Sequence, residues 1–488
     1  MVLVVSILAS FVAFLDGAIV NVALPAIQQE LGGGLSAQQW IIDAYLLTLG
    51  SLILVAGSLS DLLGRKRILS IGLWGFAIAS LLCAIAPTSG ALIAGRALQG
   101  MAGALLVPSS LALIIATFSG AGQGKAIGSW TAWTGISFIL GPLVGGILVD
   151  QASWRWIFAI NILPIAITLY LLRKVRVADK PQTMAAVDFK GAALCALGLG
   201  GAVYALIEQP HFGWSDPRIY LPLTAGILLF VAFLLYEQRT KKPMLPLGLF
   251  RNHNFSVGNV ATLLVYASLT ASFFLLVVFL QQVAGYSALA AGLAGVPITI
   301  ILFLLSSTMG SLAARYGPRL FMGFGPIIAG LGFLMMANLG TEVNYWTQVF
   351  PGVMVFGIGL AVTVAPLTAA ILGDVKPEQA GIASAVNNAV ARIAGLIAVA
   401  AVGAVVATQF SDTLDKQKLV GPPPSVIDQA KQAPLQTTPP KPYQHDLVIH
   451  RALDRASVSA FHSGVVTISG LMILGGAVSL AGIRNPKR

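Results

Sequence analysis

Among the charged residues inside long apolar stretches of this 488-residue sequence, the best candidates for chemistry are Asp16, Asp43 and Arg96. If these stretches cross a membrane, a charge inside them is costly and usually serves a function. Burial favours the neutral form of a carboxyl group, so such a group can take up and release a proton under physiological conditions. When ionised, the same group can hold a cation. Competition between a proton and a cation for one carboxylate is the simplest mechanism of exchange.

Each of these residues also has a structural interpretation. Helix packing could pin Asp16, interfacial water could reach Asp43, and Arg96 could belong to a fixed ion pair. The functional alternative for Arg96 is a contact that changes when an aspartate is protonated, because an unpaired guanidinium cannot stay buried. Arg392, which follows Asn387 and Asn388 in a later apolar stretch, fits both interpretations equally well.

The composition indicates the class of protein that must position these charges. Hydrophobic residues make up 57% of the chain and charged residues only 10%, against about 25% charged residues in soluble domains. The sequence therefore predicts a polytopic membrane protein. The two cysteines, Cys83 and Cys195, lie in apolar runs and predict no disulfide scaffold. The net charge of +11 comes without a basic patch interleaved with aromatic residues, so we expect no nucleic-acid partner.

Fourteen apolar runs are long enough to cross the hydrocarbon core as helices, which takes about 20 residues. Unbroken runs of this length exclude outer-membrane barrels, whose strands alternate in polarity. The predicted fold class is thus an all-α integral membrane protein. The expected spans are residues 3–25, 40–60, 68–87, 91–117, 126–149, 155–172, 190–208, 219–237, 256–282, 290–313, 319–340, 346–372, 380–407 and 459–483.

Basic residues predict the orientation of these spans. With both termini in the cytoplasm, the inner loops and the C-terminal tail hold 19 Lys and Arg residues, whereas the short outer loops hold two. This asymmetry is the positive-inside pattern. We therefore expect a multi-pass protein of the inner (cytoplasmic) membrane, with Asp43 near the outer end of the second span.

An internal repeat predicts the domain organisation. Gly57 and Gly64 match Gly310 and Gly317 at one offset, 253 residues, so the second span corresponds to the tenth. Two six-helix bundles with one inserted pair of helices produce this shift. The expected parts are an N-terminal bundle (1–172), an inserted pair with cytoplasmic linkers (173–255) and a C-terminal bundle (256–488). The last part includes a proline-rich segment, 408–456, which predicts an irregular extracellular loop.

Several motifs in chain order resemble those of the major facilitator superfamily, specifically its fourteen-helix drug:proton antiporters. The first span contains Leu15-Asp16-x-x-x-Val20-Asn21-Val22-Ala23-Leu24-Pro25, with Ala18 in place of the usual threonine. The second contains Trp40-x-x-Asp43-x-Tyr45, which is similar to members that export quaternary ammonium compounds. The fourth contains Arg96-x-x-Gln99-Gly100-x-x-Gly103, and the sixth Trp154-Arg155-Trp156-Ile157-Phe158-x-Ile160-Asn161.

Two further segments carry the resemblance. The loop after the second span matches the superfamily's signature, with Gly57, Asp61, Gly64, Arg65 and Lys66. The fifth span is similar to the antiporter motif, although Ser137 stands where a glycine is usual. Its members here are Gly128, Gly141, Pro142, Gly145 and Gly146. Glycines at such spacings let helices approach closely, and a proline bends the helix.

The resemblance implies alternating access between two bundles around a central cavity. The signature loop would form a cytoplasmic gate, whose second copy is degenerate because Ala314 stands at the position equivalent to Asp61. Asp16 and Arg96 are expected to couple transport to protons, and Asp16 and Asp43 to bind substrate. Spans 9–14 contain no acid away from their ends, so proton chemistry is expected only in the first bundle.

We therefore expect a secondary transporter that exports lipophilic cationic drugs or antiseptics in exchange for protons. The alternative is a proton-coupled exporter of an anionic or amphiphilic metabolite or lipid, since two buried acids against two arginines do not decide the charge of the substrate. No nucleotide-binding, metalloprotease or paired-cysteine motif occurs, so we expect neither an enzyme nor an ATP-driven pump. The expected partners are small molecules and the lipid bilayer, with no cofactor except the proton, no metal, and the chain acting as a monomer.

Overall fold

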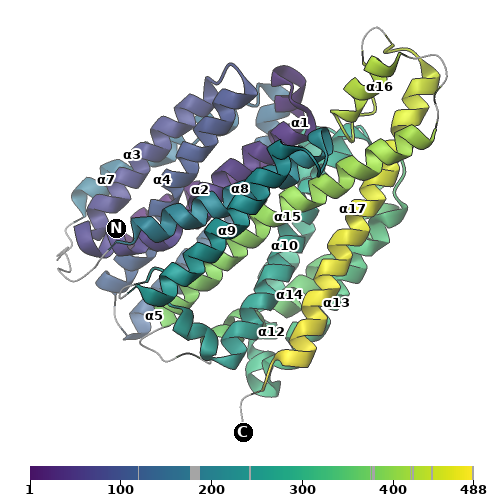
Figure 1. Ribbon diagram of the computed structural model, residues 1–488. Coiled ribbons are helices and arrows are strands. Elements are labelled where there is room, and N and C mark those ends of the chain that lie inside the picture. The colour runs from purple at the N-terminus through teal and green to yellow at the C-terminus, as the bar shows by residue number, and fades with distance from the viewer. Residues whose placement is uncertain are drawn as a thin grey trace. The chain divides into compact units, whose positions relative to one another are not determined.

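The computed structural model describes residues 1–118, 120–175, 187–240, 243–373, 375, 380–417, 419, 423–440 and 443–485. Within these ranges the side chains of residues 61, 120, 121, 124, 131, 132, 138, 372, 380, 381 and 424 are not described. The described chain is helical and contains no strand (Figure 1). Helices suit the sequence because each backbone N–H and C=O is satisfied within its own segment, as a hydrocarbon environment requires.

Fourteen candidate membrane spans are found among the described residues, as the sequence predicts. The first seven apolar segments fold as α1 (Val2–Leu31), α2 (Gly34–Leu63), α3 (Arg65–Ala84), α4 (Ser89–Thr117), α5 (Gly120–Gln151), α6 and α7 (Trp156–Ala159 and Ile162–Lys174) and α8 (Phe189–Phe212). The others fold as α9 (Pro217–Arg239), α10 (His253–Gln282), α11 and α12 (Ala288–Ala294 and Val296–Tyr316), α13 (Pro318–Leu334), α14 (Phe350–Gly373), α15 (Ala380–Lys416) and α17 (Leu447–Gly482).

Four shorter helical segments lie between these helices in the described chain. They are the 3-10 turns η1 (Leu247–Arg251) and η2 (Met335–Asn338), the π-helical turn η3 (Tyr345–Val349) that precedes α14, and α16 (Pro424–Lys431). The sixth span, expected as one helix, is divided at residues 160–161 between α6 and α7. Pro164 favours this break because it has no N–H to donate to the carbonyl four residues earlier.

The chain divides into two compact units. Unit 1 consists of Met1–Gly32, Trp40–Ala202 and Leu221–Pro246, and unit 2 of Gly33–Gln39, Val203–Tyr220 and Leu247–Arg488. The expected domain boundaries at residues 172 and 255 stay a prediction.

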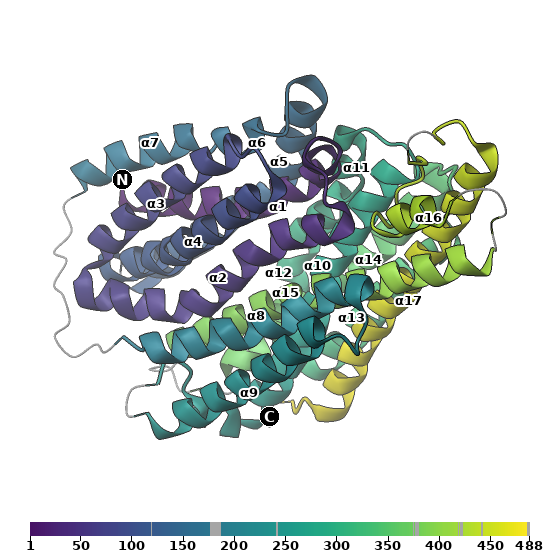
Figure 2. The same cartoon turned by 45° about the horizontal axis from the view of Figure 1, so that its top comes forward.

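Helix packing repeats between the two units. In unit 1, α1 packs against α4, α5 and α7, and α3 packs against α4 and α7. In unit 2, α10 packs against α14, α15 and α17, and α13 packs against α14 and α17. The neighbours α3, α4 and α7 can be followed in Figure 1 and again in Figure 2. The matching sets pair α1 with α10, α3 with α13, α4 with α14, α5 with α15 and α7 with α17, which is the duplication that the repeat predicts.

The repeated glycines have the same backbone conformation in both copies. Gly64, the single residue between α2 and α3, has φ 98° and ψ 133°. Gly317, the single residue between α12 and α13, has φ 92° and ψ 147°. An L-residue rarely adopts such angles, because its Cβ would collide with the backbone. The matched glycines are therefore required by two equivalent tight turns.

The prediction of an irregular loop at 408–456 is wrong for much of the segment. The helix α15 continues to Lys416 and α17 begins at Leu447. Apolar side chains hold these ends together, since Phe410, Leu414 and Leu453 are buried, and Gln417 Nε2 donates to the Ala452 carbonyl at 3.1 Å. Proline content indicated a lack of helix, but the prolines lie in the connection between the two helix ends and at the start of α16.

The Gly64 turn makes the first testable prediction. Gly64→Ala should destabilise the protein by about 1–3 kcal/mol, because alanine must adopt a sparsely populated backbone conformation. Thermal unfolding of the purified protein measures this loss. The matched control is Gly310→Ala, a helical position where an added Cβ would meet Ala365 Cβ at an ordinary 3.4 Å. Equal melting temperatures for the two variants would contradict the requirement for glycine.

Candidate functional site

Asp16 and Arg96 form a buried ion pair in unit 1. Asp16 on α1 is 0% exposed and Arg96 on α4 is 1% exposed. The distance between Arg96 Nη1 and Asp16 Oδ2 is 2.5 Å. Each charge in such a place needs a partner, because desolvation of a lone ion costs several kcal/mol. The structure thus brings together two of the residues that the sequence singled out.

Amide side chains complete the surroundings of Asp16. Its Oδ1 accepts hydrogen bonds from Gln99 Nε2 at 2.8 Å and from Asn161 Nδ2 at 2.9 Å. Ser80 Oγ on α3 lies 2.9 Å from Gln99 Nε2 and 3.4 Å from Asn161 Nδ2. Asp16 therefore receives three donors, one from Arg96 and two from amides. This arrangement fits a carboxylate, whereas a protonated carboxyl would also need an acceptor.

Arg96 has contacts that do not depend on Asp16. Its Nε donates to the Ile41 carbonyl at 3.0 Å, and its Nη1 donates to Gln99 Oε1 at 2.6 Å. The guanidinium also lies over the Tyr45 ring, 4.2 Å from the ring centroid, a distance at which cation–π attraction is effective. Tyr45 in turn donates its hydroxyl to the Ala13 carbonyl at 3.2 Å. These contacts can retain the guanidinium when the Asp16 charge is removed.

Asp43 is buried without a hydrogen-bond partner in the described part of the chain. It is 0% exposed, and neither of its carboxylate oxygens has a hydrogen-bond partner among the described atoms. The sequence leaves room for interfacial water at this position, whereas the structure gives Asp43 no exposed surface. Because an isolated buried carboxylate is very costly, the neutral carboxyl is the form that this site tolerates.

The signature loop after α2 is described in part. The Asp61 side chain lies outside the described residues. A Cβ added at Gly57 would meet nothing within 4 Å, and Gly64 makes the tight turn described above. Arg65 is half-buried. Lys66 Nζ donates to the Val175 carbonyl at 2.8 Å, which joins the beginning of α3 to the end of α7.

The glycines of the antiporter motif differ in what they contact. A Cβ added at Gly141 would lie 2.7 Å from Ala18 Cβ, and one added at Gly145 would lie 2.5 Å from Ile19 Cγ1. Both glycines therefore allow α5 to approach α1 close to Asp16. Gly128 has nothing within 4 Å of such a Cβ. Pro142 lies inside α5 and Gly146 is buried there.

The buried polar side chains of unit 2 are uncharged among the described residues. Asn387 Nδ2 on α15 lies 2.8 Å from Thr262 Oγ1 and 3.4 Å from Asn259 Oδ1, both on α10. Arg392, one helical turn beyond Asn388, is half-buried. In the described part of the chain, all buried charged side chains belong to unit 1, namely Asp16, Asp43, Arg96, Asp188 and Glu237. No group of three His, Cys, Asp or Glu residues placed to hold a metal ion occurs in that part.

A family model described as "Major Facilitator Superfamily" matches residues 6–399. The chain belongs to the Major Facilitator Superfamily. With fourteen candidate spans, this superfamily member is a multi-pass membrane transporter. The superfamily expected from the motifs is thereby confirmed.

Curated relatives align over most of their length. The "Multidrug resistance protein Stp" of Mycobacterium tuberculosis is 32% identical over 94% of this chain and 82% of its own. The "Methylenomycin A resistance protein" of Bacillus subtilis is 35% identical over 83% of this chain and 87% of its own. The "Puromycin resistance protein pur8" of Streptomyces alboniger is 34% identical over 82% of this chain and 80% of its own.

Solved structures share the superfamily fold at low sequence identity. An inward-facing, occupied bacterial homologue of the human lysosomal transporter Spinster has a TM-score of 0.67 at 15% identity, covering 99% of this chain and 98% of that chain. The peptide transporter POT in complex with sulfate has a TM-score of 0.64 at 15% identity, covering 98% of this chain and 94% of that chain. These likenesses concern the fold alone.

Sequence reasoning missed part of this superfamily member's buried cluster. Asn161 and Tyr45 stand in motifs that carried the resemblance, yet neither was assigned a role. Asn161 lies between α6 and α7, so its position depends on the helix break. Ser80 is an isolated serine in the apolar α3, and nothing in its spacing indicates that it faces an ion pair.

The ion pair predicts strong coupling between its members. Asp16→Ala and Arg96→Ala should each lower the free energy of unfolding by about 3–5 kcal/mol, because each leaves the opposite charge buried with neutral hydrogen-bond partners but no counter-charge. The double variant should lose clearly less than the sum of the two. Denaturant unfolding of the four purified proteins measures the cycle. Additive losses would mean that the pair does not interact in the folded protein.

Proposed function

We propose that this transporter exports lipophilic cationic drugs or antiseptics across the cytoplasmic membrane in exchange for protons. Relatives of 32–35% identity are named for resistance to drugs or antibiotics, which supports drug export as the function. Their bacterial sources support the cytoplasmic membrane as the location. In this proposal both termini face the cytoplasm, the chain acts as a monomer, and the proton is the only coupling ion.

The buried Asp16–Arg96 pair is the observation that carries proton coupling. With Asp16 ionised, the pair joins α1 to α4 in the described conformation. Protonation of Asp16 removes its negative charge. It also adds an O–H donor to a site where Asp16 is already surrounded by three donors. Arg96 can then rely on Ile41, Gln99 and Tyr45. The α1–α4 contact therefore loosens without leaving the guanidinium unpartnered, which links proton uptake to helix movement.

Asp43 supplies a second carboxyl group, whose surroundings lack the hydrogen-bond donors that Asp16 has among the described atoms. Its lack of hydrogen-bond donors supports a protonated side chain in this conformation. A cationic substrate that approaches Asp43 stabilises the ionised form and displaces the proton. Asp16 and Asp43 together thus give the protein two places where a proton and a positive charge compete.

The remaining motif residues are proposed to support alternating access. Asp61, Arg65 and Lys66, with Gly57 and Gly64, form the cytoplasmic gate in this proposal. Gly141 and Gly145 support it by allowing α1 and α5 to stay in close contact. Gly128, Pro142 and Gly146 complete the antiporter motif of α5.

Asp16→Asn should abolish substrate-induced proton release, because an amide cannot titrate. The release is measured by mixing purified protein with substrate in weakly buffered detergent solution that contains a pH-sensitive dye. The control is Glu30→Gln, which removes a carboxylate near the end of the same helix where Glu30 contacts Trp154 and Arg155. Export from loaded proteoliposomes should also stop when an uncoupler collapses the proton gradient. Normal proton release by Asp16→Asn would remove Asp16 from the coupling mechanism.

Asp43→Asn should weaken the binding of dicationic substrates more than that of monocationic ones. The loss of one charge contact corresponds to about 1–3 kcal/mol, or roughly five- to 150-fold in affinity. Equilibrium binding to purified protein, with matched mono- and dications, measures it. Asp216→Asn is the control, since hydrogen bonds from Arg218 lower the pKa of Asp216 to about 2 and keep it ionised throughout the assay. Equal losses for both substrate classes would assign Asp43 a general or structural role.

A further inference from the structure

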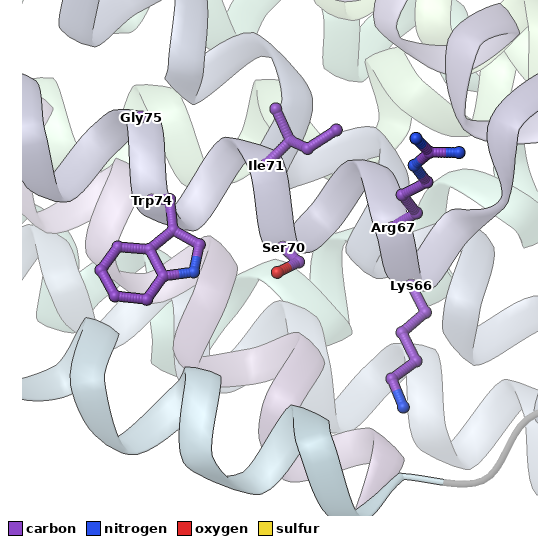
Figure 3. Close-up of a pocket in the computed structure, with 6 residues that line it drawn as sticks. All are labelled: Lys66, Arg67, Ser70, Ile71, Trp74 and Gly75. Carbon is purple, nitrogen blue, oxygen red and sulfur yellow. The ribbon is translucent and has the colours of Figure 1, made fainter.

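An open pocket of about 670 Å³ lies on α3 of unit 1, apart from the buried cluster. It is lined by Lys66, Arg67, Ser70, Ile71, Trp74 and Gly75, which are shown in Figure 3. A smaller pocket of about 230 Å³ shares three of these residues and adds Leu169, Leu172 and Arg173 of α7. The two pockets therefore form one surface groove, which we call the α3–α7 groove.

The residues of α3 form two rows along the groove. Lys66, Ser70 and Trp74 follow one another at intervals of four residues, so they lie along one helix face. In Figure 3 the Lys66 side chain extends to the opposite side of the helix from that of Arg67. Arg67 and Ile71 begin the second row, also four residues apart. Each row runs from a cation at the start of α3 to a less polar residue deeper in the span.

The order of chemistry along the groove matches that of a phospholipid. Cations come first, the Ser70 hydroxyl about one helical turn later, and Trp74 about one turn after that, so the set spans about 12 Å at a rise of 1.5 Å per residue. Ile71, Trp74 and Ile78 are 48%, 53% and 56% exposed. They lie within the candidate span Arg65–Ala84, where an exposed apolar surface faces lipid tails.

The groove is positively charged at its polar end. Lys66, Arg67 and Arg173 line it, and no acidic residue is among the described residues that do. Arg67 and Arg173 are exposed. Lys66 donates to the Val175 carbonyl, so it connects the beginning of α3 to the end of α7 as well as adding charge. A basic pocket between membrane helices at the level of the headgroups suits an anionic lipid.

We propose that the α3–α7 groove binds an anionic phospholipid from the leaflet next to the α2–α3 connection. The phosphate lies between Lys66 and Arg173, with Arg67 adding positive charge at the same end of α3, while the glycerol region lies beside Ser70 and an acyl chain runs along Trp74. This site is separate from the transported substrate and the coupling ion, so it does not depend on the proposed function. In the predicted topology the leaflet is the cytoplasmic one.

Lipid binding to the purified transporter tests the charge requirement. Native mass spectrometry compares phosphatidylglycerol with phosphatidylcholine of identical acyl chains. The wild-type protein should prefer the anionic lipid, and Arg67→Gln/Arg173→Gln should reduce this preference by about fivefold for each cation removed. Arg239→Gln/Arg251→Gln removes two exposed arginines outside the groove and should leave the preference unchanged. Equal effects of the two double variants would overturn the site and indicate only general charge attraction.

A spectroscopic measurement places the acyl chain. Phosphatidylglycerol brominated on its acyl chains should quench Trp74 fluorescence more than brominated phosphatidylcholine at the same mole fraction. The difference between the wild-type protein and Trp74→Phe isolates this residue from the other seven tryptophans. Equal quenching by both lipids would contradict a bound anionic lipid at Trp74. Full displacement of the lipid by millimolar glycerol phosphate would show that the groove recognises a soluble anion, and would also overturn the proposal.

Discussion

The arrangement of unit 1 depends on the cost of burying the Asp16–Arg96 ion pair. Either charge alone would be destabilising in this apolar interior. The structure offsets that cost with groups from several helices: α1 supplies Asp16, α4 supplies Arg96 and Gln99, α2 supplies the Ile41 carbonyl and Tyr45, and Asn161 comes from the α6–α7 break. A shift of any of these helices by a few ångströms breaks a charge-assisted hydrogen bond. The small residues Gly141 and Gly145 matter for the same reason, because they set the distance between α5 and the helix that carries Asp16.

The two buried aspartates show how different surroundings can favour different charge states of the same type of side chain. Asp16 and Asp43 are both fully buried, yet Asp16 receives three donors and Asp43 receives none from the described atoms. The first site stabilises a negative charge and the second excludes it. A protein with both sites can hold one proton while it keeps one carboxylate ready to accept another. In the proposed exchange of protons for a cation, the two sites therefore start from different protonation states.

The sequence predicted the fold well because membrane helices depend on apolar length, which can be counted, and on small residues with fixed spacing. It also identified Asp16, Asp43 and Arg96, since charges are conspicuous in apolar runs. It did not identify Ser80 or Asn161 as members of the cluster, because a lone serine or amide is unremarkable until the packing shows what it faces. The state of Asp43 was equally hidden, since the absence of hydrogen-bond partners is a property of three-dimensional packing. The segment 408–456 was misjudged because its prolines outweighed the apolar residues that extend α15 and α17.

The internal repeat explains how buried charge can be confined to one half of a duplicated fold. Helix packing in the two units follows the same pattern, and Gly64 and Gly317 make the same turn. These features depend on backbone geometry and small residues, which both copies keep. Buried charge depends on single side chains, and among the described residues it is found in unit 1 alone, while unit 2 buries neutral groups such as Asn259 and Thr262. Because both units share the packing pattern, whereas among the described residues only unit 1 buries carboxyl groups, the duplicated backbone does not itself require buried charge.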